Sequence, residues 1–439
     1  MAEYNISTYN SRNTLIHALA RCELKNSKWK KDMEDVTVFI DGYGGREGAS
    51  FFGVFDGFHG RSSALIASRE LPVLVLEQLS KQDPSFSLEK TQGDLLSRFG
   101  GLFDRESMDA NTASSELQRD DSAKVGQAFS AAFHRMDRLL ALGRNETSRV
   151  RWSGCTALLC LIDDGEDQGV ASPSGRIVIA NCGNIHAVLC TRASASRLTK
   201  DHSTSNFKER KRIIQNGGCI SLNRRHGLVE GLTKATRGLG HFGDQKLKQS
   251  VIPVPYTLSL PYDPSFQLLV LASSGVWEVL DEREVKEIAN TAIDRTKRSF
   301  MLRDLRLGQT CAQASPEFRG DSSNVDSQDV SVKDQDGKQL SVETLGEEEE
   351  RGNIWGTRDQ ELTTALEQES GVHVEENLAP TQGNPPLDYE HLAAEVCREI
   401  VDAAVASESK ENISVLVILL KGLEDISDAV QKPNKLHVI

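Results

Sequence analysis

The stretch that decides the fold is Phe51-Phe52-Gly53-Val54-Phe55-Asp56-Gly57-Phe58-His59-Gly60. Its first half is aromatic and β-branched, which is typical of a buried strand, and the glycines that follow indicate a turn. Such a strand would deliver the carboxylate of Asp56 into a glycine turn at the end of a sheet. A single acidic side chain at the end of an apolar strand indicates a functional site.

Short runs of the same composition recur along the chain and predict further strands. They are Val36 to Ile40, Thr156 to Ile162, Arg176 to Asn181, Ala187 to Thr191, Leu268 to Ala272 and Ile413 to Leu420. Apolar residues at helical spacing predict helices within 125–140, 285–293 and 392–400. Strands that cluster and are joined by turns favour antiparallel sheets with helices outside over a repeated βαβ plan.

The composition and the charge of the chain limit which kinds of partner and which cellular compartment we expect. The 439-residue chain has a formal charge of −13, which argues against nucleic acid and against an anionic membrane surface. No stretch approaches the roughly 20 apolar residues of a membrane span, and the N-terminus lacks a secretory pattern. We therefore expect an intracellular protein, cytoplasmic or nuclear, whose partners are proteins. Its 8 cysteines form no C-x-x-C pair, which indicates buried free thiols.

Further motifs lie before and after the opening stretch, in a fixed order along the chain. They are Trp29-Lys30-Lys31-Asp32-Met33-Glu34-Asp35, Ser153 to Ala157, Ile179 to Val188, Leu232 to Gly240, Leu268 to Leu280 and Glu408 to Val415. Block by block, the chain resembles the type 2C, metal-dependent protein serine/threonine phosphatases. The resemblance covers about 26–80, 124–296 and 388–422. It implies an α+β fold, a four-layer α-β-β-α sandwich of two antiparallel sheets flanked by helices.

The resemblance also implies roles for individual residues. In that family the counterpart of Asp56 bridges two divalent metals, the carbonyl of the counterpart of Gly57 binds one of them, and an acidic pair that includes Glu34 supports metal-bound water. Lys30 stands where an arginine grips the substrate phosphate. Lysine is a point charge without the two parallel donors of arginine, so we expect at most a vestigial phosphate contact.

Three metal-linked positions depart from the family's pattern. Ser274 stands at a metal-ligand aspartate, Glu411 at the last metal aspartate, and Asn184 at an aspartate linked to an additional metal. Two dications about 4 Å apart repel by roughly 17 kcal/mol at an effective dielectric of about 20, and carboxylates must offset that repulsion. With a neutral Ser274 and a longer, displaced Glu411, we expect no metal or one weakly bound Mg²⁺ or Mn²⁺, where the family binds two.

The proton donor is a separate departure. An unshifted alignment places Phe58 at the family's histidine, and a phenyl ring cannot donate a proton. A one-residue insertion in the turn would instead make His59 the donor. Both registers remain open.

These substitutions favour an inactive or nearly inactive protein, because they remove metal ligands and weaken the phosphate contact. The apolar strand residues around the lost ligands are intact, so we expect the fold itself to be retained. The sequence predicts a pseudophosphatase with a degenerate dimetal site and no confident catalytic residue, acting by binding proteins or phosphoproteins. One alternative is a weak Mg²⁺- or Mn²⁺-dependent protein serine/threonine phosphatase. The other is a scaffold that recruits partners through an acidic insertion.

The predicted domain organisation has a single phosphatase-like domain that is interrupted by insertions. We expect an N-terminal extension and first strand region (1–25), the domain itself (26–298 and 387–422) with a polar insertion at about 82–122, an acidic and largely disordered insertion (299–386), and a C-terminal tail (423–439). The acidic insertion contains Glu347-Glu348-Glu349-Glu350 and lacks a sustained apolar period.

Overall fold

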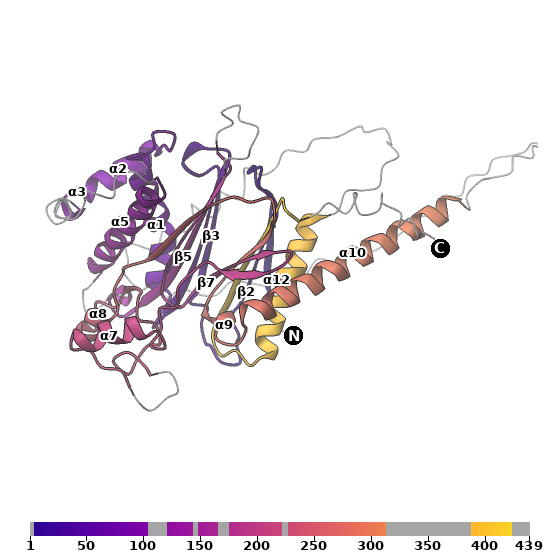
Figure 1. Cartoon of the computed structure of the whole chain (residues 1–439). Coiled ribbons are helices and arrows are strands. Elements are labelled where there is room, and N and C mark those ends of the chain that lie inside the picture. The colour runs from indigo at the N-terminus through magenta and orange to yellow at the C-terminus, as the bar shows by residue number, and fades with distance from the viewer. Residues whose placement is uncertain are drawn as a thin grey trace, which may run out of the picture. The chain divides into compact units, whose positions relative to one another are not determined.

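A computed structural model describes residues 4–103, 121–143, 148–165, 175–221, 227–312 and 388–423 (Figure 1). Residues 1–303 together with 386–439 form one compact unit, and residues 304–385 form a second. The strands of the described chain all belong to the first unit.

Two antiparallel sheets form the centre of this unit. The first sheet has the order β1 (Asn5–Tyr9), β2 (Ile16–Leu24), β12 (Ile413–Leu420), β11 (Phe266–Ala272), β7 (His186–Thr191) and β8 (Ala195–Arg197). The second has the order β10 (Tyr256–Pro261), β6 (Arg176–Cys182), β5 (Gly154–Asp163), β4 (Ala49–Phe58) and β3 (Val36–Asp41), and β9 (Leu239–Gly240) also pairs with β5.

Helices cover the outer face of each sheet. Figure 1 shows α1 (Ser62–Ser80) and α5 (Asp121–Ala141) on the side of the second sheet, and α12 (Tyr389–Ala406) on the side of the first. The first part of α10 (Glu282–Ala312) packs beside α12. The shorter helices are η1 (Tyr43–Gly45), α2 (Lys90–Arg98), α3 (Gly100–Phe103), α6 (Arg149–Trp152), α7 (Phe207–Gln215), α8 (Gln245–Ser250) and α9 (Ser274–Trp277).

The side chains of β4 show why the strands are apolar on both faces. Phe51 and Phe55 pack outward against α1 and α5, whereas Phe52 and Val54 pack inward between the two sheets. Successive side chains of a strand point to opposite faces, so a strand covered on both sides reads as a continuous apolar run. Burial of each such side chain contributes about 1.5–3 kcal/mol. The predicted α-β-β-α sandwich is confirmed.

The runs predicted as strands lie within β3, β4, β5, β6, β7, β11 and β12, and the predicted helices are confirmed in α5, α10 and α12. The sequence did not single out β2 or α1. The strand β2 mixes alanine with Arg21 and Glu23, which lowers its apparent strand propensity. The helix α1 is buried on several sides and contains Pro72, so it lacks a clear apolar stripe.

The predicted start of the acidic insertion falls within a helix. The acidic insertion was expected to begin at 299, but α10 continues to Ala312. Met301, Leu302 and Leu305 are residue types with high helix propensity, which favours continuation of the helix beyond 299. The polar insertion at 82–122 contains α2 and α3, and its residues 104–120 lie outside the described residues. The acidic insertion after residue 312 and the tail after residue 423 lie outside them as well.

The cysteines and the helices bear on two further expectations, buried free thiols and the lack of a membrane span. The cysteines at 22, 155, 160, 182, 190 and 397 are free and buried, as predicted, whereas Cys219 is free but exposed. In the part of the chain that the structure describes, no helix is both long enough and apolar enough to cross a bilayer.

Candidate functional site

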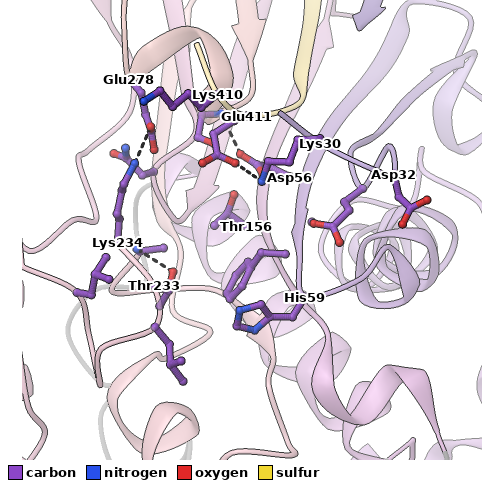
Figure 2. Close-up of a pocket in the computed structure, with 18 of the residues that line it drawn as sticks. Lys30, Asp32, Asp56, His59, Thr156, Thr233, Lys234, Glu278, Lys410 and Glu411 are labelled. Atoms are coloured by element: carbon purple, nitrogen blue, oxygen red, sulfur yellow. Dashed lines mark hydrogen bonds and ion pairs between the residues drawn. The ribbon is translucent and has the colours of Figure 1, made fainter. Parts of the chain in front are cut away.

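A pocket of about 680 Å³ lies where β4 ends. Figure 2 shows side chains that enter it from several segments of the chain. Every residue that the sequence analysis assigned to the site lines this pocket: Lys30, Glu34, Asp56, Gly57, Phe58, His59, Asn184, Ser274 and Glu411. The structure therefore brings together residues that are almost 400 positions apart in the sequence.

The strand β4 places Asp56 and Gly57 at the pocket. Their ladder partners on β5 are Thr156 and Cys155, and the pairing continues without a shift through Phe58. A Cβ atom on Gly57 would lie 2.5 Å from the carbonyl oxygen of Glu34. Only glycine allows the segment that carries Glu34 to approach the strand this closely.

The Asp56 carboxylate accepts a hydrogen bond from the backbone N–H of Ser274, with 2.9 Å between N and Oδ2. Ser274 is the first residue of α9, which directly follows β11. Desolvation by the surrounding protein raises the pKa of Asp56 to about 6, opposed by the Ser274 hydrogen bonds and increased by the charge of Glu411. The hydroxyl of Ser274 adds no negative charge.

Glu411 forms an ion pair with the Lys30 ammonium group, marked by a dashed line in Figure 2. Each of the two side chains is about one-third exposed, at 31% and 32%. Burial lowers the pKa of Lys30, but the hydrogen bond and charge of Glu411 and the charges of Glu34 and Asp56 outweigh it, so the pKa is raised. The ammonium group therefore stays charged and faces carboxylates.

Glu34 also has a donor within the protein. Its Oε1 accepts a hydrogen bond of 2.7 Å from the backbone N–H of Gly60, in the turn after β4. The three carboxylates at the centre of the pocket thus each accept from the chain itself: Asp56 from Ser274, Glu411 from Lys30, and Glu34 from Gly60.

Asp35 lies behind the pocket and is only 1% exposed. Neither carboxylate oxygen has a well-formed hydrogen bond. Burial and the charge of Asp56 raise the pKa of Asp35 well above its usual value, although the nearby hydroxyls of Ser273 and Ser414 oppose the rise. Burial therefore disfavours the charged form of Asp35 relative to an exposed carboxyl group.

Two asparagines hold the loops of the pocket together. The amide nitrogen of Asn412 donates to the carbonyl oxygens of Lys25 (2.8 Å) and Asp32 (3.1 Å). Its oxygen accepts from the backbone N–H of Glu34 at 3.0 Å. The amide of Asn26 donates in the opposite direction, to two carbonyl oxygens of the loop that carries Asn412, at 2.7 and 3.0 Å. The sequence analysis assigned these asparagines no role, because their partners lie at the other end of the chain.

The ring of Phe58, which stands at the family's histidine in the unshifted alignment, contacts the ring of a buried histidine. The rings of Phe58 and His241 lie 4.0 Å apart between centroids. His241 is buried, and neither ring nitrogen has a hydrogen-bond partner among the residues that the structure describes. Burial lowers the pKa of His241 to about 3, so the ring is neutral. His59 follows β4 with φ +58° and lines the pocket. The structure thus places both Phe58 and His59 at the site, one in the strand and one in the turn.

Asn184 is part of a neutral hydrogen-bonded chain. Its side-chain oxygen lies 3.1 Å from Nε2 of His186, and Nδ1 of His186 lies 2.8 Å from the hydroxyl of Thr199. The pair Lys234 and Glu278 closes the same side of the pocket with an ion pair of 2.6 Å.

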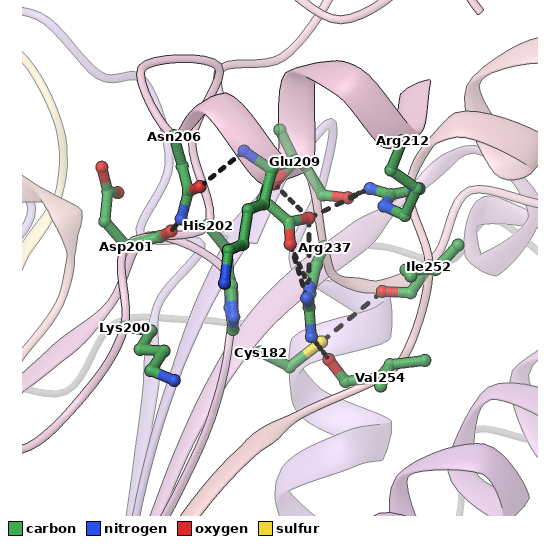
Figure 3. Close-up of polar contacts among 12 residues, drawn as sticks. Cys182, Lys200, Asp201, His202, Asn206, Glu209, Arg212, Arg237, Ile252 and Val254 are labelled. Carbon is green, nitrogen blue, oxygen red and sulfur yellow. Dashed lines mark hydrogen bonds and ion pairs between the residues drawn. The ribbon is translucent and has the colours of Figure 1, made fainter. Parts of the chain in front are cut away.

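The dipeptide Asp201–His202 joins neighbouring loops through hydrogen bonds. Nδ1 of the buried His202 accepts from the backbone N–H of Gly183 at 3.2 Å. The carbonyl of Asp201 accepts from the side-chain amide of Asn206 at 2.9 Å. Figure 3 shows this dipeptide beside the carboxylate of Glu209, which binds Arg237 and Arg212.

The buried histidines His186 and His202 are expected to lower the stability of the protein in acid. Burial, followed by the charge of Arg197 or Arg237, lowers the pKa of His186 and of His202 from 6.5 to about 3. Below pH 6.5 the unfolded chain therefore binds protons that the folded chain does not, and the free energy of unfolding falls as the pH falls towards 3. Each histidine is expected to contribute a loss of roughly 1.4 kcal/mol per pH unit in this window.

Urea unfolding at several pH values measures this loss. The variant His202→Asn keeps a hydrogen-bond acceptor but does not titrate, so its unfolding free energy should depend less steeply on pH than that of the wild type. Equal slopes for the two proteins would contradict the assignment.

The described residues do not fit a pair of divalent cations. Mg²⁺ and Mn²⁺ bind carboxylate and carbonyl oxygens, and here Ser274 replaces a carboxylate, its N–H points at Asp56, and Glu411 is engaged by Lys30. Across the described ranges, no group of three or more histidine, cysteine, aspartate or glutamate side chains is placed to hold a metal ion. The metal role of Asp56, Gly57, Glu34 and Glu411 stays a prediction.

Two antiparallel sheets between helices, with an acid-lined pocket where β4 ends, define a phosphatase-like sandwich protein. The family model described as Protein phosphatase 2C matches residues 97–315. The chain is 35% identical over 466 residues to "Protein phosphatase 2C-like domain-containing protein 1" of Homo sapiens, which covers 93% of this chain and 73% of the relative. The chain belongs to the protein phosphatase 2C family.

Other comparisons agree with this assignment. The Mus musculus protein with the same name is 39% identical over 327 residues, covering 68% of this chain and 53% of the relative. Among solved structures, a phosphatase from a pathogenic strain of Toxoplasma gondii superposes with a TM-score of 0.51 at 14% identity, covering 97% of both chains. A C. elegans sex determining protein gives a TM-score of 0.52 at 17% identity, covering 96% of this chain and 67% of the other. These structures show the shared fold.

Proposed function

We propose that this member of the family is a pseudophosphatase, which keeps the pocket of the fold and binds a protein ligand there without hydrolysing phosphate. The observation that carries the proposal is that the three central carboxylates of the pocket already have partners within the chain. Asp56, Glu411 and Glu34 each accept a hydrogen bond or ion pair from within the chain.

Metal-dependent phosphate hydrolysis needs three things: an activated water or hydroxide, a cation that holds the phosphate, and an acid for the leaving oxygen. In this pocket Ser274 lowers the charge available for metals, and Lys30 is paired with Glu411. Phe58 occupies the end of β4 and cannot donate a proton. All three requirements are weakened together, whereas the scaffold is intact.

The surface near the pocket supports a protein ligand. Leu232, which lines the pocket, and Trp29 are each 47% exposed. The ammonium groups of Lys28 and Lys410 lie 5.1 and 4.9 Å from the Trp29 ring centroid, and Lys410 also lines the pocket. Exposed aromatic and aliphatic side chains among polar ones are typical of protein interaction sites. The ligand we propose is a protein or phosphoprotein segment, and neither nucleic acid nor a membrane surface.

A phosphatase assay tests the proposal. The full chain, with Mn²⁺ present, is given a phosphothreonine peptide and p-nitrophenyl phosphate, beside an Asp56→Ala variant prepared in the same way. We expect the same background release of phosphate from both proteins. Release by the wild type that clearly exceeds that of the variant would overturn the proposal.

A weak Mg²⁺- or Mn²⁺-dependent serine/threonine phosphatase is the second candidate. The observation that favours it is that Asp56, Gly57, Glu34 and His59 all line one pocket. This candidate predicts that turnover depends on Asp56 and that His59→Gln lowers it further. The same assay with both variants separates the two functions.

A further inference from the structure

The Lys30 side chain places a positive charge among the carboxylates of the pocket. Its ammonium group forms an ion pair with Glu411, and the negative charges of Glu34 and Asp56 also act on it. A lysine ammonium is a compact cation with three donors. Within this pocket it supplies positive charge at the carboxylates that the sequence analysis assigned to metals.

The surrounding loops hold Lys30 in this place. Lys30 lies between Lys25 and Asp32, whose carbonyl oxygens accept from Asn412, the residue next to Glu411. The backbone N–H of Lys30 also donates to the carbonyl oxygen of Asn26 at 3.1 Å. The backbone segments that carry Lys30 and Glu411 are therefore already joined by hydrogen bonds.

We propose that the Lys30 ammonium group is a built-in cation of the pocket, which occupies Glu411 in place of a divalent ion and keeps the loops of the site in a metal-free arrangement. A tethered cation has a high effective concentration at its partner, because its backbone is already fixed there. A free Mg²⁺ or Mn²⁺ must displace the ammonium group and also lose part of its own water shell. The ligand class that Lys30 excludes is thus a hard divalent cation.

Binding of Mn²⁺ by lysine variants tests this assignment. The free Mn²⁺ that remains in solution is measured by its electron paramagnetic resonance signal, with the full-length wild type, Lys30→Met and Lys28→Met. We expect Lys30→Met to bind Mn²⁺ at least about tenfold more tightly than the wild type, since changes to the side chains that contact metal ligands alter affinity by about 10–100-fold. The melting temperature of Lys30→Met should also rise when Mn²⁺ is added.

Lys28→Met is the matched control. It removes the same charge two positions away, from an exposed side chain that lies over the Trp29 ring. A gain of equal size in Lys28→Met would mean that only the general charge changed, and would overturn the proposal. No gain in Lys30→Met would overturn it as well.

The double variant Lys30→Met with Glu411→Gln identifies the carboxylate that is released. We expect it to lose the gain seen in Lys30→Met, whereas a retained gain would show that Glu411 is not the residue involved. If Lys30→Met folds poorly, Lys30→Gln carries the same test with a polar side chain. These readouts are separate from turnover: Mn²⁺-dependent hydrolysis by the wild type would overturn the proposed function, and a failure of Lys30→Met to gain Mn²⁺ would overturn only the role of Lys30.

Discussion

Replacing Glu209 by alanine is expected to lower the free energy of unfolding by about 3–5 kcal/mol. Glu209 is 4% exposed and accepts from Arg237, Arg212 and the hydroxyl of Thr236. Removing the carboxylate leaves two partly buried guanidinium groups without their counter-charge, which is the costly way to break a buried ion pair.

The pH dependence of this contribution has a defined sign. Burial raises the pKa of Glu209, but the hydrogen bonds and charge of Arg237 and the charge of Arg212 outweigh it and lower the pKa below the usual 4.5. The stabilisation is therefore complete above about pH 4.5 and is lost as the pH falls through the lowered value of the folded state.

Urea unfolding near neutral pH measures the loss. Glu47→Ala is the control, because Glu47 forms an ion pair with Arg12 in which the side chains are 81% and 72% exposed. Exposed pairs contribute about 0–1 kcal/mol. A loss for Glu209→Ala no larger than that of the control would contradict a structural role for this cluster.

Placing aspartate at both position 274 and position 411 is expected to create a metal site. The variant Ser274→Asp with Glu411→Asp adds one negative charge beside Asp56 and shortens the side chain that pairs with Lys30. Because first-shell ligands matter more than outer-shell partners, whose loss costs 10–100-fold, we expect Mn²⁺ affinity to rise by at least about 100-fold.

Ser274→Asn with Glu411→Asp is the matched control, since it has nearly the same shape without the added charge at 274. Calorimetric titration with Mn²⁺ compares the two. If both variants bind Mn²⁺ equally, charge at position 274 is not what the wild-type pocket lacks.

The strands and the main helices could be predicted because their evidence is local, whereas the four-layer arrangement followed from the resemblance to the phosphatase family. The apolar run of β12 matches the predicted Ile413–Leu420 at both ends, and the order of the motifs fixed which strands flank the site. The membership of the pocket was also predictable, because residues such as Asp56, Ser274 and Glu411 each lie in a recognisable motif.

The contacts within the pocket could not be predicted in the same way. The ion pair of Lys30 with Glu411 and the hydrogen bonds of Asn412 with Lys25 join segments at opposite ends of the chain. The packing of Phe58 on His241 likewise joins the end of β4 to the residue that follows β9. Sequence patterns identify which residues are present, whereas the partner of each donor depends on tertiary structure.

We propose that the wild-type pocket, whose three central carboxylates accept from groups within the chain, does not hold a pair of divalent cations. Calorimetric titration of the full-length protein with Mn²⁺, beside Asp56→Ala, tests it most directly. We expect no saturable uptake of two ions by the wild type, and little difference from Asp56→Ala. Two tightly bound Mn²⁺ ions per chain that are lost in Asp56→Ala would contradict the claim.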